Sequence, residues 1–276
     1  MTKVTVTAIQ AASRAASWEE KWEGADLPHA LALLDAAAAQ GATLACFPEL
    51  YPLVGEAEIA ARAKQHGMTV VAGLADGSRE RWYNTSSIIS PEGQVIGRQT
   101  KNYPTAIEIE RGVVPGERFQ VFDTPVGRLG IVICADFAFF NDGAAACREG
   151  GADMILNPAV WFALAEAFPH TVIGRHMEYS LPVIGVNLAR PDEASRDARF
   201  PPAGGYTTLC IPPPVTDLDQ LWGWFNSKPG GIDSTEGFVQ TLGPQEGLLT
   251  VEVDLEAVRR FPGYFSTRTP EHVGSV

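Results

Sequence analysis

The sequence has few cysteines and fewer basic than acidic residues. Its 276 residues include four cysteines, without the C-x-x-C pairing typical of zinc sites, so neither a disulfide framework nor a metal or other cofactor is predicted. Against 33 Asp and Glu stand 21 Lys and Arg, a formal net charge of −12. Because a surface of that sign repels phosphate groups, we expect no nucleic-acid partner.

Long apolar runs are also missing at the start of the chain. The first ten residues alternate polar and apolar side chains, without the continuous apolar stretch that a signal peptide or a membrane span requires. We therefore expect a cytoplasmic protein with no membrane partner. Hydrophobic residues make up 45% of the chain and charged residues 20%, which excludes a disordered or fibrous protein.

The length of the chain allows one large domain or two small ones, at roughly 150 residues per domain. No shift in composition divides the sequence, and no segment repeats at a fixed period. We therefore expect a single domain over residues 1–276.

The hydrophobic pattern predicts strands that alternate with helices, and two hairpins in the middle of the chain. Residues 4–8 alternate with the period of two of a half-buried strand, and a helix that Pro28 opens is expected to end at Gly41. This mixture of parallel crossovers and antiparallel hairpins predicts an α/β protein. The further predicted segments are strands at 43–47, 68–74, 154–156, 183–187 and 248–253, helices at 56–65, 144–148 and 255–260, and hairpins at 86–98 and 119–133.

Residues 190–235 are rich in Pro, Gly and Asp, and their composition predicts a long loop. The loop contains Trp222 and Trp224. Two interpretations stay open: these rings line or cap a pocket, or they pin a surface loop to the body of the protein.

Three side chains suited to one kind of chemistry follow predicted strands or extended runs, namely Glu49, Lys101 and Cys134. Side chains at the carboxyl ends of neighbouring strands converge on one edge of a sheet. A thiolate attacks a carbonyl or nitrile carbon, a carboxylate takes the thiol proton and later activates water, and an ammonium group stabilises the developing negative charge. Together the three make an acyl-transfer apparatus that needs no metal.

The segments around these residues resemble the nitrilase superfamily of carbon–nitrogen hydrolases. Phe47-Pro48-Glu49-Leu50 is similar to its general-base motif, Lys101-Asn102-Tyr103-Pro104-Thr105 to its lysine motif, and Gly130-Ile131-Val132-Ile133-Cys134-Ala135-Asp136 to its nucleophile motif. Residues 151–153 and 157–161 are similar to later family positions, as are Glu178, Asn187 and 252–255. The resemblance therefore covers nearly the whole chain, with the motifs in the family's order.

The resemblance implies a four-layer α-β-β-α sandwich of two mixed sheets flanked by helices, in a homodimer or a higher homo-oligomer. It makes Cys134 the nucleophile, Glu49 the general base and Lys101 the cation that stabilises the oxyanion. The backbone N–H of Ala135 is expected to assist Lys101 at the oxyanion.

A second glutamate normally holds the lysine and the substrate in this family. The spacing from Lys101 favours Glu108, whereas the spacing back from Pro115-Gly116 permits Glu110. Trp161 and Tyr103 are expected to contact the substrate, with the large face of Trp161 suited to an apolar or aromatic acyl group.

Ala135-Asp136 after the nucleophile is more similar to the amidase and carbamoylase branches than to the Trp-Glu of nitrilases. The resemblance thus implies hydrolysis of a small linear amide or N-carbamoyl compound through a thioester on Cys134. Two alternatives remain. One is a nitrilase, because Pro104-Thr105 is similar to the corresponding residues of nitrilases. The other is a catalytically silent scaffold that binds a partner. The sequence does not determine which small amide, carbamoyl or nitrile compound is the substrate.

A papain-like pair of cysteine and histidine is a further alternative, with His170 or His176 as the base. It lacks an orienting Asn or Asp at a recognisable spacing. We expect His176 to pack near the site instead, with Arg175 and Glu178 as its salt-bridge partners. The remaining cysteines, Cys46, Cys147 and Cys210, are predicted to be structural.

Overall fold

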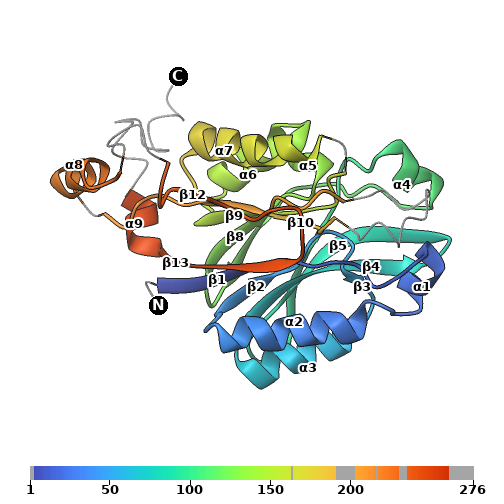
Figure 1. Cartoon of the computed structure of the whole chain (residues 1–276). Helices are drawn as coiled ribbons and strands as arrows, with labels where there is room; N and C mark the ends of the chain where they lie inside the picture. Colours follow the sequence, from blue (N-terminus) through green and yellow to red (C-terminus); the bar gives the residue numbers. More distant parts are fainter. Residues whose placement is uncertain (1–2, 163, 191–202, 216, 230–234, 261–276) are drawn as a thin grey trace.

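The computed structural model describes residues 3–162, 164–190, 203–215, 217–229 and 235–260. Two β-sheets lie face to face, and helices cover the outer face of each sheet (Figure 1). This arrangement confirms the expected α-β-β-α sandwich.

The first sheet has the strand order β13-β1-β2-β4-β5-β6, with β3 paired to β4. Strands β1, β2 and β4 are parallel, whereas β5, β6 and β13 join by antiparallel pairing, so the sheet is mixed. Its strands are β1 Lys3–Gln10, β2 Leu44–Cys46, β3 Pro52–Leu53, β4 Thr69–Ser78, β5 Arg81–Ile89, β6 Val95–Thr100 and β13 Gly247–Asp254.

The second sheet has the order β12-β11-β10-β9-β8-β7. Strands β8, β9 and β10 are parallel, and β7, β11 and β12 add antiparallel edges. Its strands are β7 Val121–Thr124, β8 Gly127–Ile131, β9 Met154–Ala159, β10 Val183–Asn187, β11 Thr208–Cys210 and β12 Val239–Thr241.

Helices α2 Leu27–Ala39 and α3 Glu56–His66 pack on the outer face of the first sheet, and α5 Ala135–Ala138, α6 Asp142–Glu149 and α7 Phe168–Tyr179 on that of the second (Figure 1). Helix α2 ends at a turn that holds Gly41 at φ +80°, as predicted. The other helices are α1 Trp18–Trp22, α4 Ala106–Glu110, η1 Ala165–Ala167, α8 Leu218–Asn226 and α9 Leu255–Arg260.

The main core lies between the two sheets. Alternate residues of the strands point inward, such as Val6 and Val71 from the first sheet and Leu156 and Ile184 from the second, and all four are fully buried. Burial of these apolar surfaces holds the sheets together. Their packing fixes the position of loops from one sheet against loops from the other.

The prediction of a long loop over residues 190–235 is wrong for the described part of that range, which contains β11 and α8. Asp217 caps α8, and Leu221 and Trp224 pack with Phe238 on one face of the helix. Trp222 is exposed, and neither tryptophan lines the cavity described below. Cys210 lies buried in β11. Residues 191–202 and 230–234 lie outside the described residues.

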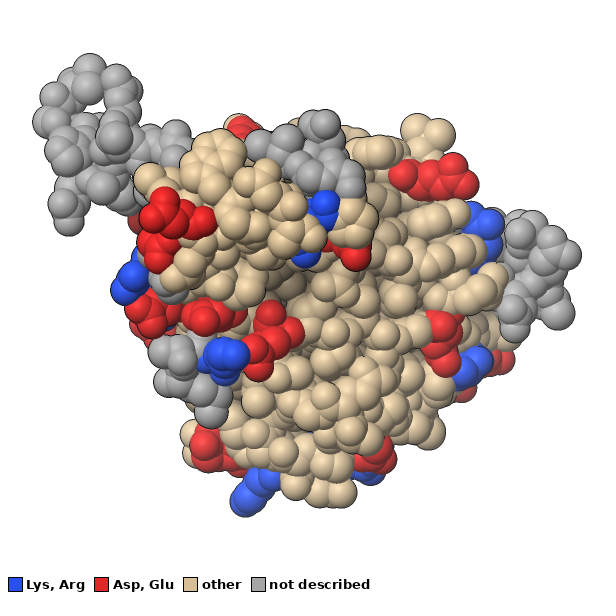
Figure 2. Space-filling view, turned by 60° about the vertical axis from the view of Figure 1, so that its left-hand side comes forward, with Lys and Arg blue, Asp and Glu red and all other residues tan. Residues whose placement is uncertain are grey.

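Among the described residues, no helix has both the length and the apolar character needed to cross a membrane. The face drawn in Figure 2 carries acidic and basic side chains in several mixed groups, with a broad area of uncharged side chains between them.

Candidate active site

A cavity of about 280 Å³ opens where the chain leaves β2, β6 and β8. Glu49 lies just after β2, Lys101 directly after β6, and Cys134 between β8 and α5. All three line the cavity, together with Glu108 from α4. The structure thus brings together the four residues that were expected to be catalytic.

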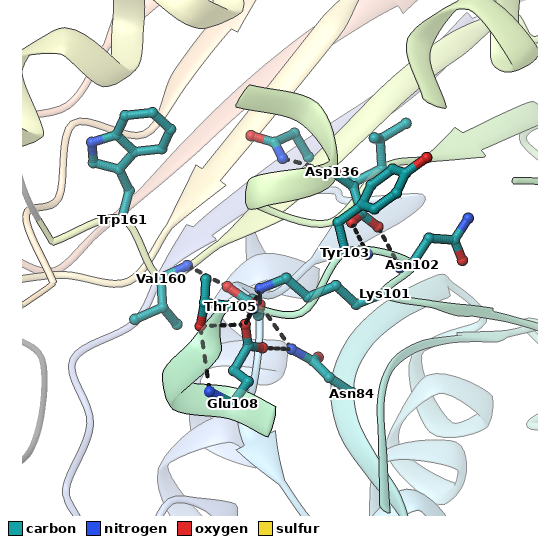
Figure 3. Close-up of polar contacts among 12 residues, drawn as sticks. Asn84, Lys101, Asn102, Tyr103, Thr105, Glu108, Asp136, Val160 and Trp161 are labelled. Atoms are coloured by element: carbon teal, nitrogen blue, oxygen red, sulfur yellow. Dashed lines mark hydrogen bonds and ion pairs between the residues drawn. The ribbon is translucent and has the colours of Figure 1, made fainter. Parts of the chain in front are cut away.

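Lys101 lies between two carboxylates. Its Nζ donates to Oε1 of Glu49 and to Oε2 of Glu108, both at 2.7 Å (Figure 3). Burial alone would lower the pKa of Lys101, but the carboxylates of Glu49 and Glu108 outweigh it and raise the pKa above its usual range. The lysine therefore stays charged, and one of its three N–H donors remains after the two carboxylates are bound.

Asn84, which no motif of the sequence singles out, completes this cluster. Its Nδ2 donates to Oε1 of Glu49 and to Oε1 of Glu108, both at 2.8 Å, and its side chain is fully buried (Figure 3). Asn84 lies in β5, before the start of the predicted hairpin at residue 86. A single polar residue there gives no local signal, because only the pairing of β4, β5 and β6 places it beside the glutamates.

Glu49 is held on both of its carboxylate oxygens. While Oε1 accepts from Lys101 and Asn84, Oε2 accepts from the backbone N–H of Val160 at 2.8 Å. Val160 follows β9, so the second sheet helps to hold a carboxylate that belongs to the first. This contact joins Glu49 to the segment after β9, at the cavity that Cys134 also lines.

Glu108 belongs to a capping box at the start of α4. Thr105 accepts from the Glu108 N–H, while Oε2 of Glu108 accepts from the N–H of Thr105 at 2.8 Å. Burial raises the pKa of Glu108, but Lys101 outweighs that effect, and the pKa is lowered. Glu110, two residues along the same helix, is exposed and does not line the cavity. Glu108 is therefore the glutamate that the structure joins to Lys101.

Cys134 occupies a sharp turn from strand to helix. Its φ of +47° lies in a region that costs a non-glycine residue about 1–3 kcal/mol, and its N–H donates to Pro158 O at 2.9 Å. Burial and the carboxylate of Glu49 raise the pKa of the Cys134 thiol well above its ordinary value, against the opposing effect of Lys101. The thiol is thus neutral at rest and needs a base to become a nucleophile.

Ala135 lies beside Cys134 as the first residue of α5 and lines the cavity. The first N–H groups of a helix have no partner within the helix. Such a group beside Cys134 is suited to receive a developing negative charge.

Asp136 connects α5, the helix that follows Cys134, to the segment that follows Lys101. Its carboxylate accepts from the N–H of Asn102 at 2.9 Å and from that of Tyr103 at 2.7 Å (Figure 3). Burial raises the pKa of Asp136 to about 7. The Tyr103 ring, expected to contact substrate, stacks on Phe140 and donates to Asp142 from its hydroxyl, and it does not line the cavity.

Trp161 does line the cavity. Its backbone N–H donates to Oδ1 of Asn187 at 2.7 Å, and its ring stacks with Phe139 at a centroid distance of 5.8 Å. In Figure 3 its ring stands apart from the hydrogen-bonded cluster.

The papain-like alternative is wrong, because neither His170 nor His176 lines the cavity. His176 is buried against Phe238, and its Nδ1 lies 2.6 Å from the Leu181 carbonyl oxygen. The expected salt bridges to His176 are also wrong. Arg175 and Glu178 pair with each other instead, at 2.7 Å.

The other three cysteines, Cys46, Cys147 and Cys210, are buried, and burial raises the pKa of each thiol. They lie in apolar surroundings between or behind the sheets. None lines the cavity, so Cys134 is the cysteine placed to meet a substrate there. Among the described residues, no three His, Cys, Asp or Glu side chains are arranged to hold a metal ion.

Residues 5–262 match the family model described as carbon–nitrogen hydrolase. The omega-amidase NIT2-A of Xenopus laevis is 25% identical over 264 residues, which cover 84% of this chain and 83% of that protein. The omega-amidase NIT2 of Mus musculus is 24% identical, with coverage of 74% and 79%.

Solved structures show the same fold. Nit3 of Saccharomyces cerevisiae, a member of the nitrilase superfamily, superposes with a TM-score of 0.74 at 17% identity, covering 97% of this chain and 96% of that one. A mutant amidase from Nesterenkonia sp. AN1 superposes with a TM-score of 0.70 at 18% identity, covering 99% and 97%. That amidase carries the acetamide moiety of fluoroacetamide on its active-site cysteine.

Proposed function

The chain belongs to the carbon–nitrogen hydrolase family, and we propose that it is an amidase that cleaves a linear amide or N-carbamoyl compound through a thioester on Cys134. The observation that carries the proposal is the cluster of Glu49, Lys101 and Glu108 in one cavity with Cys134. The omega-amidase relatives and the fold shared with an amidase support this substrate class.

In the first half of the reaction, Glu49 takes the proton of the Cys134 thiol and the sulfur attacks the carbonyl carbon. The remaining N–H of Lys101 and the N–H of Ala135 stabilise the negative charge on the carbonyl oxygen. The proton passes from Glu49 to the leaving nitrogen, the C–N bond breaks, and ammonia or an amine departs. The acyl group remains on Cys134 as a thioester.

In the second half, Glu49 takes a proton from water, and the resulting hydroxide attacks the thioester carbon. The C–S bond breaks, the carboxylic acid leaves, and the thiol of Cys134 regains its proton. One amide and one water give one acid and one ammonia or amine. Glu108 and Asn84 hold Lys101 and Glu49 in place throughout.

The test is ammonia release from a panel of linear amides by the wild type, Cys134→Ala and Glu108→Gln, with circular dichroism to check folding. We expect release by the wild type, none by Cys134→Ala, and a loss of about 10²-fold or more in kcat for Glu108→Gln. Glu110→Gln is the matched control, because Glu110 lies on the same helix outside the cavity. Amide turnover by folded Cys134→Ala contradicts the proposal, and turnover of nitriles alone favours the nitrilase alternative.

A further inference from the structure

We infer that the substrate of this site is a neutral amide whose acyl group is apolar and about the size of an aromatic ring. The inference rests on the proposed amidase function and adds to it the class of acyl group. The residues that line the cavity, its volume and its charges support it.

The cavity has polar and apolar walls. Its polar side chains are those of the catalytic cluster and Thr105 at one end, with Arg111 as the further charged group. Its remaining walls are large and apolar, contributed by the loop after β2, by α4, by the end of α5 and by the segment after β9. These wall residues are Leu50, Ile107, Phe139, Trp161, Phe162 and Leu164.

Several of these apolar side chains are unusually exposed. Phe139 has 72% of its surface accessible and Leu164 has 83%, and both lie at the same cavity as the half-buried ring of Trp161. Apolar surface gathered at a concave site favours an apolar ligand, because covering it removes that surface from water. The exposure therefore points to an acyl group that packs on these side chains.

The volume sets the size of that group. A dry protein cavity of about 150 Å³ holds a benzene molecule. The cavity of about 280 Å³ thus has room for one ring together with the carboxamide at Cys134. A two-carbon acyl group would leave most of the apolar wall uncovered.

The charges disfavour an anionic acyl group. Lys101 is bound by two carboxylates, and those of Glu49 and Glu108 repel a further one. The guanidinium carbon of Arg111 lies 5.1 Å from the ring centroid of Trp18, a residue that does not line the cavity. A carboxylate placed among the rings of Phe139 and Trp161 would lose its water without a matching gain.

The test is kcat/KM for phenylacetamide, acetamide and the anion succinamate, in the wild type and in Ile107→Ala and Ile109→Ala. The two isoleucines are matched, since they lie on α4 with 49% and 48% exposure, but Ile107 alone lines the cavity. We expect phenylacetamide to exceed both other amides by about 10-fold or more. We expect Ile107→Ala to cut that advantage by about 10-fold, mainly through KM, and Ile109→Ala to leave it unchanged.

A higher kcat/KM for succinamate than for the other two amides overturns the inference and indicates that Arg111 binds the anionic group. Equal kcat/KM for the three amides, or an advantage that Ile107→Ala does not reduce, also overturns it while the amidase function stands. If none of the amides is hydrolysed, the amidase function itself fails, and the inference fails with it.

Discussion

The thiol of Cys134 is subject to burial and to two charged neighbours with opposite effects on its pKa. Burial and the carboxylate of Glu49 raise the pKa, whereas the ammonium group of Lys101 lowers it. The thiol is thus kept protonated beside a carboxylate that can take the proton at the moment of attack. A resting thiol is also a weaker target for oxidation or alkylation than a resting thiolate.

Glu49→Gln tests the role of the carboxylate as base. Glutamine retains the shape and an oxygen for the Val160 N–H but cannot accept the thiol proton. We expect kcat for amide hydrolysis to fall by about 10²–10⁴-fold, measured by ammonia release. Activity within a few-fold of the wild type would assign the base to another group.

Substitutions of Asn84 test whether the carboxylates of Glu49 and Glu108 need a neutral hydrogen-bond donor between them. Asn84→Ala leaves two buried carboxylate oxygens without one of their donors, and we expect a loss of about 1–3 kcal/mol in the free energy of unfolding. Asn84→Asp adds a third carboxylate to the cluster, so we expect it to lose more stability and more kcat than Asn84→Ala. Urea unfolding and steady-state kinetics measure both; the reverse order would show that Asn84 only fills space.

At the scale of elements, contacts of the segments that carry the candidate catalytic side chains hold these side chains in place. Lys21, buried in α1, pairs with Asp26 at 2.7 Å and donates to the carbonyl oxygen of Leu50 at 2.8 Å. Leu50 has a φ of +56° and directly follows Glu49. A buried ion pair thus holds the turn that carries Glu49, the proposed general base.

Gly73 in β4 leaves room for the same turn. A Cβ at this position would lie 2.4 Å from the carbonyl oxygen of Pro48 and 2.5 Å from the backbone nitrogen of Leu50. Backbone atoms cannot rotate aside, so we expect Gly73→Ala to displace Glu49, lower kcat and cost about 1–3 kcal/mol in the free energy of unfolding.

Gly174 is the control for that substitution. It is exposed within α7, and a Cβ there would meet nothing within 4 Å. We expect Gly174→Ala to stabilise the protein by about 0.5–1 kcal/mol without a change in kcat, measured by urea unfolding and ammonia release. A Gly73→Ala enzyme that behaves like Gly174→Ala would show that the turn has space to move.

The raised pKa of Asp136 leads us to expect that the free energy of unfolding depends on pH. Its pKa is about 7 in the folded protein against an ordinary value of 3.8, so between these pH values the folded state holds a proton that the unfolded state has released. This group therefore makes stability fall as the pH rises from about 4 to about 7.

The substitution Asp136→Asn removes that contribution. In urea unfolding at a series of pH values, we expect the free energy of unfolding of the variant to rise relative to that of the wild type by about 3 kcal/mol between pH 4 and pH 7. Parallel curves for the two proteins would show that Asp136 does not titrate in this range.

At the scale of the whole molecule, the candidate site exists only where the two sheets meet. Glu49 and Lys101 come from the first sheet, whereas Cys134 and the N–H of Val160 come from the second. The local patterns of the sequence predicted an α/β protein, and the resemblance of its motifs to the nitrilase superfamily implied the sandwich. It also predicted Glu49, Lys101, Cys134 and Glu108 as members of one site.

What the sequence did not predict depends on contacts between distant segments. Val160 acts through its backbone N–H, which every residue type except proline carries, and Asn84 acts only through the register of β5. Tyr103 carries a suitable ring, but Asp136 holds its backbone and the ring stacks on Phe140 instead. For α8, the apolar spacing of Leu221 and Trp224 was present, but the surrounding Pro and Gly residues favoured a loop.

The most direct test of the account is acid-quenched mass spectrometry of the wild type during turnover of a slow amide, followed by peptide mapping. The account predicts the mass of the acyl group on the peptide that contains Cys134, and its disappearance when the amide is exhausted. Turnover with the acyl group on another residue, or with no acyl adduct on Cys134 at any time point, would contradict it.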